Sequence, residues 1–280
     1  MTERVATKEE RRVQPSRAGM YTAAFSGLML RDARVLLRDL FPFLTRTVMN
    51  PLLFVFVFTY VFPKIGQGIP GGGGQSFATI LVPGLVAVAM VTQGIFAAAL
   101  PLVTEFGTTH EIEDRVMAPL PVAAVALEKV TFSAIQAVLS GLVVFPLVYL
   151  VPATHVSVHV DNWPLLVVVM ALSSFTAGSL GLAIGTSFNP RQISLIFAMI
   201  VVPMTFLGCV YYPWARLEEV RWLQIVVLVN PVVYMSEGLR STLTPELPHM
   251  HALVFLGALC VAFASLTAIG VRNFTRRVLT

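Results

Sequence analysis

Hydrophobic residues in this chain gather into six long runs that are separated by shorter polar segments. The runs cover about residues 43–63, 78–103, 122–151, 163–187, 193–211 and 250–271. About 20 consecutive apolar residues in an α-helix are enough to cross the ~30 Å hydrocarbon core of a membrane. A transmembrane β-barrel would instead show segments of about ten residues with alternating hydrophobicity. The continuous runs therefore predict an all-α polytopic membrane protein with six transmembrane helices.

An amphipathic helix is predicted directly before the first span, over residues 20–41. Its apolar face carries Leu30, Ala33, Leu37 and Leu40, and its basic face carries Arg31, Arg34 and Arg38 at i, i+3 and i+7. Such a helix is expected in the inner membrane interface, where the arginines meet anionic headgroups. The alternative is a simple cytosolic extension of the first span. Residues 1–19 are charged and poor in apolar residues, which predicts a disordered cytoplasmic tail, and residues 42–280 are expected to form the transmembrane domain.

Composition and charge agree with a membrane protein and give its orientation. Hydrophobic residues make up 56% of the 280 residues and charged residues only 12%, about half of what a soluble domain carries. Fifteen of the 19 Lys and Arg residues lie on the segments predicted to face the cytoplasm, and the other four are Lys64, Arg216, Arg221 and Arg240. This positive-inside bias predicts that both termini face the cytoplasm. The two cysteines, Cys209 and Cys260, lie in apolar runs and are expected to act as small hydrophobic residues.

The polar connection between the second and third spans, Glu105–Pro121, is the main candidate for a contact with a soluble partner. Thr108 or Thr109 is a plausible helix N-cap, acidic residues follow in the first turn, and Pro119 and Pro121 end the helix. One interpretation is a coupling helix, about residues 108–118, that docks on a cytosolic protein. The other is an ordinary solvated loop. The coupling candidates are Thr108, Thr109, Glu111, Glu113, Asp114, Arg115 and Met117.

The sequence matches two known functional motifs in part, but neither motif is complete. His110-Glu111 begins like a zinc-protease helix, but Asp114 stands where the second histidine is needed. The outer Gly71–Gly74 run lacks the Gly-Lys-Ser/Thr ending of a phosphate-binding loop. We therefore expect no catalytic residue, no metal and no cofactor in this chain.

Two features of the spans themselves also suggest roles. Glu128 and Lys129 lie near the inner end of the third span, where a lysine can extend to the headgroups, so they are expected to anchor the span and, as a second role, to contribute to the coupling joint. Ala177, Gly181 and Gly185 repeat every four residues in the fourth span. Small residues at this spacing allow close helix packing, either within the subunit or across a dimer.

The segment between the last two spans, about residues 211–248, is too apolar for a free external loop. It is interrupted by Pro213 and by Asn230-Pro231, and it carries interface-preferring Trp and Tyr side chains. A re-entrant pair of short helices in the outer leaflet fits this pattern. A seventh span is the alternative, but it would move the basic C-terminus outside. The candidate gate residues are Tyr212, Pro213, Asn230, Pro231, Tyr234, Glu237 and Arg240.

From Met20 to Thr280 the chain resembles a permease of the type-2 ABC exporter family, which includes daunorubicin-resistance and nodulation-factor export permeases. The resemblance depends on the order and spacing of several short motifs, because none of them is decisive alone. These are Arg31–Arg38 before Asn50-Pro51-Leu52-Leu53-Phe54, then Leu81-Val82-Pro83-Gly84-Leu85, Gly107-Thr108, Ala118-Pro119-Leu120-Pro121, Tyr212-Pro213, Leu228-Val229-Asn230-Pro231 and Glu237-Gly238-Leu239-Arg240. The family often has Glu-Arg before its Gly-Thr, whereas Glu105-Phe106 precedes Gly107 here.

The resemblance implies a pair of permease subunits, identical or homologous, above two cytosolic ATPase subunits that bind ATP and Mg²⁺. It implies that the 108–117 helix sits in an ATPase groove beside the interfacial helix. It also implies that substrate passes between the permeases near the inner ends of the first, second and fifth spans, and that the re-entrant hairpin shapes the exit.

The expected function is ATP-driven export of an amphipathic drug, lipid or glycolipid through the cytoplasmic membrane of a bacterium. Export of a polysaccharide or lipid-linked oligosaccharide is the alternative. An intramembrane lipid-modifying enzyme is a remote third possibility, because the spans hold no converging catalytic set. No nucleic-acid partner is expected.

Overall fold

The computed structural model describes residues 17–38, 40–61, 64–65, 77–109, 120–150, 158–188 and 192–279. All regular secondary structure within these residues is helical, which confirms the predicted all-α class. Among the described residues, four helical segments are long and apolar enough to cross a membrane: Thr79–Gly107, Val122–Leu150, Trp163–Ser187 and Ala252–Val278. A fifth segment is counted if the bent helix pair Trp214–Val229 and Pro231–Leu243 forms one span.

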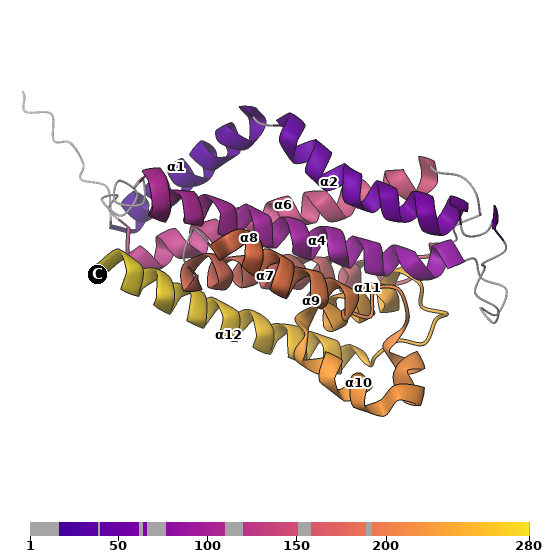
Figure 1. Ribbon diagram of the computed structural model, residues 1–280. Coiled ribbons are helices and arrows are strands. Elements are labelled where there is room, and N and C mark those ends of the chain that lie inside the picture. The colour runs from indigo at the N-terminus through magenta and orange to yellow at the C-terminus, as the bar shows by residue number, and fades with distance from the viewer. Residues whose placement is uncertain are drawn as a thin grey trace, which may run out of the picture.

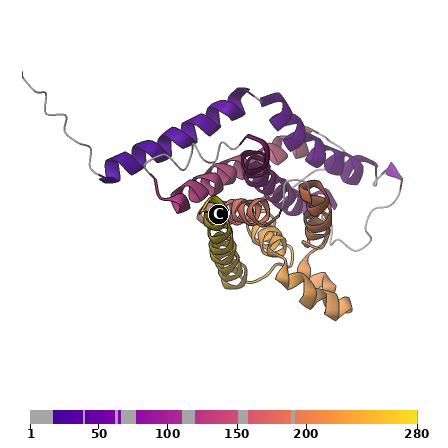
Figure 2. The same cartoon turned by 60° about the vertical axis from the view of Figure 1, so that its left-hand side comes forward.

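The centre of the bundle is α4 (Phe77–Thr104), which packs between α6 (Val122–Leu150) and α7 (Trp163–Ser187) (Figure 1). In the most apolar window of α4, 83% of the residues are buried, against 11% for α12 (Ala252–Leu279). The long α12 packs along α7 at the side of the bundle (Figure 2). The protein therefore shields α4 on nearly every side, whereas α12 offers most of its apolar surface to lipid.

The first and fifth predicted spans coincide with helices of different lengths. The first is α2 (Leu40–Val55), which continues into a π-helical turn, η1 (Phe56–Val61); the 16 and 6 residues together extend ~33 Å, enough for the hydrocarbon core. The fifth is built from α8 (Ile193–Ile196), η4 (Phe197–Val201) and α9 (Val202–Phe206). These 4, 5 and 5 residues extend only ~21 Å. Helix α9 ends at Phe206, five residues before the end of the apolar run.

The predicted amphipathic helix is present as α1 (Arg17–Arg38), which begins three residues earlier than expected. Leu30 and Leu37 of its apolar stripe are 57% and 64% exposed. Arg31, Arg34 and Arg38 are exposed as well. The described residues therefore leave most of both stripes uncovered.

The small residues of α7 pack against α4 of the same chain. A Cβ atom added at Gly181 would lie 2.8 Å from the carbonyl oxygen of Ile95, and one added at Gly185 would lie 3.0 Å from Cα of Ala99. The Cβ of Ala177 would in turn lie 2.6 Å from a Cβ added at Gly94. These small residues therefore allow α4 and α7 of one subunit to pack closely.

This close approach predicts that Gly181→Ala destabilises the bundle. The new Cβ meets the backbone of α4, so the two helices must separate, at a cost of about 1–3 kcal/mol. Gly257→Ala in α12 is the matched control, because nothing lies within 4 Å of a Cβ atom added there and Ala is the better helix former. Thermal unfolding in detergent should show a lower midpoint for the first variant only. Equal midpoints would contradict close α4–α7 packing.

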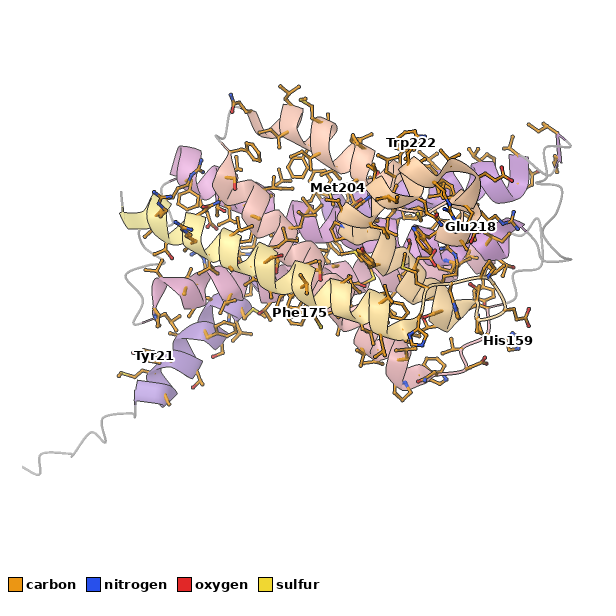
Figure 3. The ribbon with its side chains drawn as sticks, turned by 90° about the horizontal axis from the view of Figure 1, so that it is seen from below. Tyr21, His159, Phe175, Met204, Glu218 and Trp222 are labelled. Carbon is orange, nitrogen blue, oxygen red and sulfur yellow. The ribbon has the colours of Figure 1, made fainter. Side chains whose placement is uncertain are left out.

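The segment after α9 forms two short limbs. The first limb is η5 (Trp214–Val220), α10 (Arg221–Val226) and η6 (Val227–Val229), and the second is α11 (Pro231–Leu243). The helix direction bends by 104° between the two limbs, and the break falls at Asn230, as the Asn230-Pro231 pair predicts. Figure 3 labels Glu218 and Trp222 of the first limb at the opposite end of the bundle from Tyr21 of α1.

Candidate functional site

The predicted coupling connection lies mostly outside the described residues. Thr108 and Thr109 end η2 (Glu105–Thr109), a π-helical turn that continues α4. His110–Pro119 is not described, and this segment contains the coupling candidates Glu111, Glu113, Asp114, Arg115 and Met117. The described structure nevertheless contains both flanks of the connection, which are η2 before it and the start of α6 after it.

A buried ion cluster joins these two flanks to α1. Lys129 of α6 is only 3% exposed. Its Nζ donates to Oδ2 of Asp32 in α1 at 2.9 Å and to Oε1 of Glu105 in η2 at 3.0 Å. Asp32 and Glu105 are also buried. One ammonium group therefore holds three helices together.

This geometry corrects the expected role of Lys129. A lysine that anchors a span extends its charged end to the lipid headgroups, whereas the Lys129 ammonium is enclosed by protein and paired with two carboxylates. The anchoring prediction is therefore wrong for Lys129. The second role, a contribution to the joint around the connection, agrees with the observed contacts.

The cluster makes the joint resistant to separation of its parts. Removing one partner from a buried ion pair leaves an uncompensated charge in a medium of low polarity, which typically costs about 3–5 kcal/mol. Because Asp32, Glu105 and Lys129 lie on three different helices, none of the helices can leave the joint without such a cost. The cluster therefore ties α1, α6 and the end of α4 together on both sides of the connection.

A second buried charge pair lies on α11, at the other end of the bundle. Glu237 and Arg240 are both 0% exposed and form an ion pair with each other. The Glu237 carboxylate also accepts hydrogen bonds from the backbone N–H of Trp214 and of Met250, each at 3.0 Å. Arg240 Nη2 donates to the carbonyl oxygen of Cys209 at 3.1 Å. One pair of side chains thus fixes the chain on both sides of the two-limbed segment.

Other predicted gate residues support the same segment. Asn230 caps α11 by accepting from the Val232 N–H at 3.0 Å, and its Nδ2 donates to the Met204 carbonyl oxygen at 2.7 Å. The Tyr234 hydroxyl donates to the Leu228 carbonyl oxygen at 2.7 Å. Pro213 precedes the first turn of η5, and Tyr212 is half-buried beside it. These contacts make the segment a built structure rather than a loose loop.

Sequence reasoning missed the partners of both charge pairs. Most partners of Glu237 and Arg240 are backbone atoms, which carry no signal in the sequence. The partners of Lys129 lie 97 and 24 residues away. The available signal was the isolated acidic position of Asp32 within a basic stripe and of Glu105 at the end of an apolar run.

The fold and these charge clusters define a polytopic helical membrane protein with a polar joint at one end. The family model of the ABC-2 type transporter matches residues 23–244, and the chain belongs to this family. It is similar to the inner membrane transport permease YadH of Escherichia coli (strain K12), with 27% identity over 199 residues, or 70% of this chain and 74% of that protein. The same protein from Shigella flexneri matches with the same identity and coverage. The chain is a membrane transporter subunit of the inner membrane.

Proposed function

We propose that this chain is the permease subunit of an ATP-driven ABC exporter that moves an amphipathic substrate across or out of the cytoplasmic membrane. Two permease subunits, identical or homologous, pair with each other and with two cytosolic ABC ATPase subunits. ATP and Mg²⁺ are bound by the ATPases, and this chain performs no chemistry of its own. The observation that carries the proposal is the buried Lys129 cluster between the two flanks of the 110–119 connection.

The proposed topology has six spans, a re-entrant two-limbed segment and both termini in the cytoplasm. The ~33 Å length of α2 with η1 supports the first span. The short α8–α9 segment forms most of the fifth span, and the non-helical residues 207–213 cross the rest of the membrane. Arg272, Arg276 and Arg277 lie toward the C-terminal end of α12, at the same end of the bundle as the start of α1 (Figure 1). Positive charge gathered at one end supports a cytoplasmic location for that end.

In the proposed mechanism the ATPase pushes on the 108–118 coupling helix. The Lys129 joint converts this push into movement of α1, α4 and α6 as one unit. Because α4 is the buried centre of the bundle, its displacement changes the packing of every helix that contacts it. The two-limbed segment at the opposite end, held by Glu237 and Arg240, forms the exit gate.

Neutralising the connection is expected to abolish ATPase docking. We expect Glu111→Ala/Glu113→Ala/Arg115→Ala to lose co-purification with the partner ATPase and its coupled ATP turnover. Glu218→Ala/Glu219→Ala/Arg221→Ala is a matched control, since it removes the same charges from exposed positions of the two-limbed segment. Affinity co-purification and ATP hydrolysis in proteoliposomes measure both effects. Unchanged assembly and turnover in the first variant would refute the coupling-helix proposal.

A further inference from the structure

Two cavities of different chemistry lie between the helices. One, of about 740 Å³, lies between α9, η6 and α12, and its lining includes Asn230, Tyr234 and Ser265. Each of these side chains already forms hydrogen bonds with the protein backbone. This cavity therefore offers an apolar wall and little else to a ligand.

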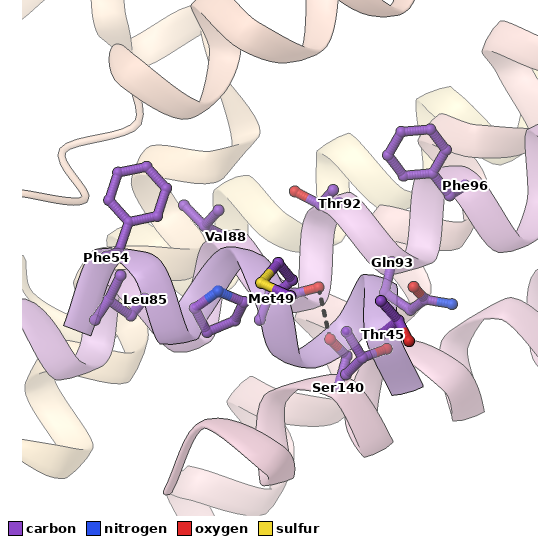
Figure 4. Close-up of a pocket in the computed structure, with 12 residues that line it drawn as sticks. Thr45, Met49, Phe54, Leu85, Val88, Thr92, Gln93, Phe96 and Ser140 are labelled. Atoms are coloured by element: carbon purple, nitrogen blue, oxygen red, sulfur yellow. Dashed lines mark hydrogen bonds between the residues drawn. The ribbon is translucent and has the colours of Figure 1, made fainter. Parts of the chain in front are cut away.

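The other cavity, of about 360 Å³, lies between α2, α4 and α6 (Figure 4). Its apolar wall includes Phe54, Val88 and Phe96. Its polar wall consists of Thr45, Thr47, Thr92, Gln93 and Ser140. A few polar groups on an otherwise apolar wall are typical of pockets that bind amphipathic small molecules.

Two of the three threonine hydroxyls of this cavity differ from the other threonine hydroxyls that the structure describes. A threonine inside a helix commonly donates to the carbonyl oxygen one turn earlier, as Thr45 does to Phe41 at 2.9 Å. Among the threonines whose side chains the structure describes, Thr47 and Thr92 are the two whose hydroxyls form no hydrogen bond. Both line this cavity. Thr47 is only 3% exposed and its hydroxyl oxygen is enclosed by protein, whereas Thr92 is half-buried at the cavity wall.

Gln93 adds a further hydrogen-bonding group. It is 5% exposed, and its Nε2 donates to Oε1 of Gln136 at 3.0 Å. Its own Oε1 accepts no hydrogen bond from a described residue. The cavity wall therefore presents one unbonded hydroxyl, that of Thr92, which donates and accepts, and one amide oxygen, which accepts.

The chemistry of the described lining residues narrows the class of ligand. None of these twelve residues is ionisable at neutral pH, so they provide no counter-ion for a cationic drug or an anionic headgroup. Buried polar groups without a partner are costly, and a ligand rich in hydroxyl groups satisfies both donors and acceptors. We propose that this cavity binds an uncharged, hydroxyl-bearing ring of an amphipathic substrate, such as the sugar headgroup of a glycolipid. This inference rests on the proposed export function and specifies the chemistry of its cargo.

The test is photolabelling of the full chain in lipid nanodiscs. The probe is an alkyl glucoside with a diazirine in its chain, and the comparison probe carries trimethylammonium in place of the sugar. We expect the glucoside to label peptides of α2 and α4 that line the cavity, and excess unlabelled alkyl glucoside to compete. The cationic probe should label these peptides much less.

A variant then tests the Thr92 hydroxyl. Thr92→Val should weaken glucoside labelling by about threefold to tenfold for the hydrogen bond lost. The same variant should unfold at or above the wild-type temperature without ligand, because it removes a hydroxyl that forms no hydrogen bond with the described residues. Thr45→Val is the control, since the Thr45 hydroxyl lines the same cavity but is bonded within its own helix, and this variant should label like the wild type.

Equal labelling by both probes, or an equal loss in the control variant, would overturn the assignment. The same preparations are assayed for co-purification with the ATPase and for coupled turnover. If these persist while the glucoside does not label the cavity, the cargo assignment fails and the export function stands. If assembly and turnover are absent as well, the proposed function itself fails.

Discussion

Lys129→Met is expected to be among the most damaging single substitutions in this chain. It leaves the carboxylates of Asp32 and Glu105 buried without the ammonium group that pairs with both of them. Breaking a buried pair in this way costs about 3–5 kcal/mol, and in a chain of this size that corresponds to a fall of about 10 °C in the thermal midpoint. Coupled ATP turnover should be lost along with stability, because α1, α4 and α6 no longer form one joint.

Two further variants separate folding from coupling. Lys64→Met is the matched control, because Lys64 is exposed and should tolerate the same substitution. Asp32→Asn/Glu105→Gln/Lys129→Met removes all three charges together, so no uncompensated charge remains and the midpoint should largely recover. If turnover stays low in this triple variant, the charges act in coupling. Retention of both the midpoint and turnover in Lys129→Met would contradict the joint.

The difference between expected and observed roles of Lys129 shows the limit of sequence patterns here. The position of a lysine near a helix end is visible in the sequence, and extension to the headgroups is the usual result. Whether its side chain finds lipid or a carboxylate depends on which helices pack beside it. That is decided by tertiary contacts with Asp32 and Glu105, which are far away in the sequence.

Hydropathy located the helices better than it located their ends. The long apolar runs at 78–103, 122–151, 163–187 and 250–271 coincide with α4, α6, α7 and α12, because only a helix satisfies the backbone within hydrocarbon. The run 193–211 does not remain helical to its end. Residues 207–211 are as apolar as the helix before them, so no change in composition marks the stop.

The end of α9 is instead fixed by contacts with α11. The Gly208 carbonyl oxygen accepts a hydrogen bond from the Ser236 hydroxyl at 2.7 Å, and the Cys209 carbonyl oxygen accepts one from Arg240. A Cβ atom at position 208 would lie 2.5 Å from Cγ1 of Val232, so glycine is required for this approach. Cys209 has a φ of 52°, a value that leaves the helical path. These partners are tertiary and could not be predicted from the apolar run.

Arg240→Met is expected to release the same segment. The Glu237 carboxylate would keep its hydrogen bonds from the N–H groups of Trp214 and Met250 but would lose the positive charge of Arg240. The Cys209 carbonyl oxygen would lose its hydrogen-bond donor. The cost of about 3–5 kcal/mol expected for a broken buried pair should lower the thermal midpoint. Because the pair fixes both sides of the two-limbed segment, amide hydrogen exchange should rise most strongly in residues 207–230.

Arg216→Met is the control for this prediction, because it makes the same substitution at an exposed arginine of η5. It should change neither the thermal midpoint nor amide hydrogen exchange. Glu237→Gln/Arg240→Met removes the uncompensated carboxylate while one side-chain oxygen remains to accept a backbone N–H. The double variant should therefore be more stable than Arg240→Met alone. If the double variant is less stable than Arg240→Met, or if hydrogen exchange rises uniformly along the chain, the pair does not stabilise this segment locally. If the order holds, stability at this end depends on the compensation of charge rather than on the arginine itself.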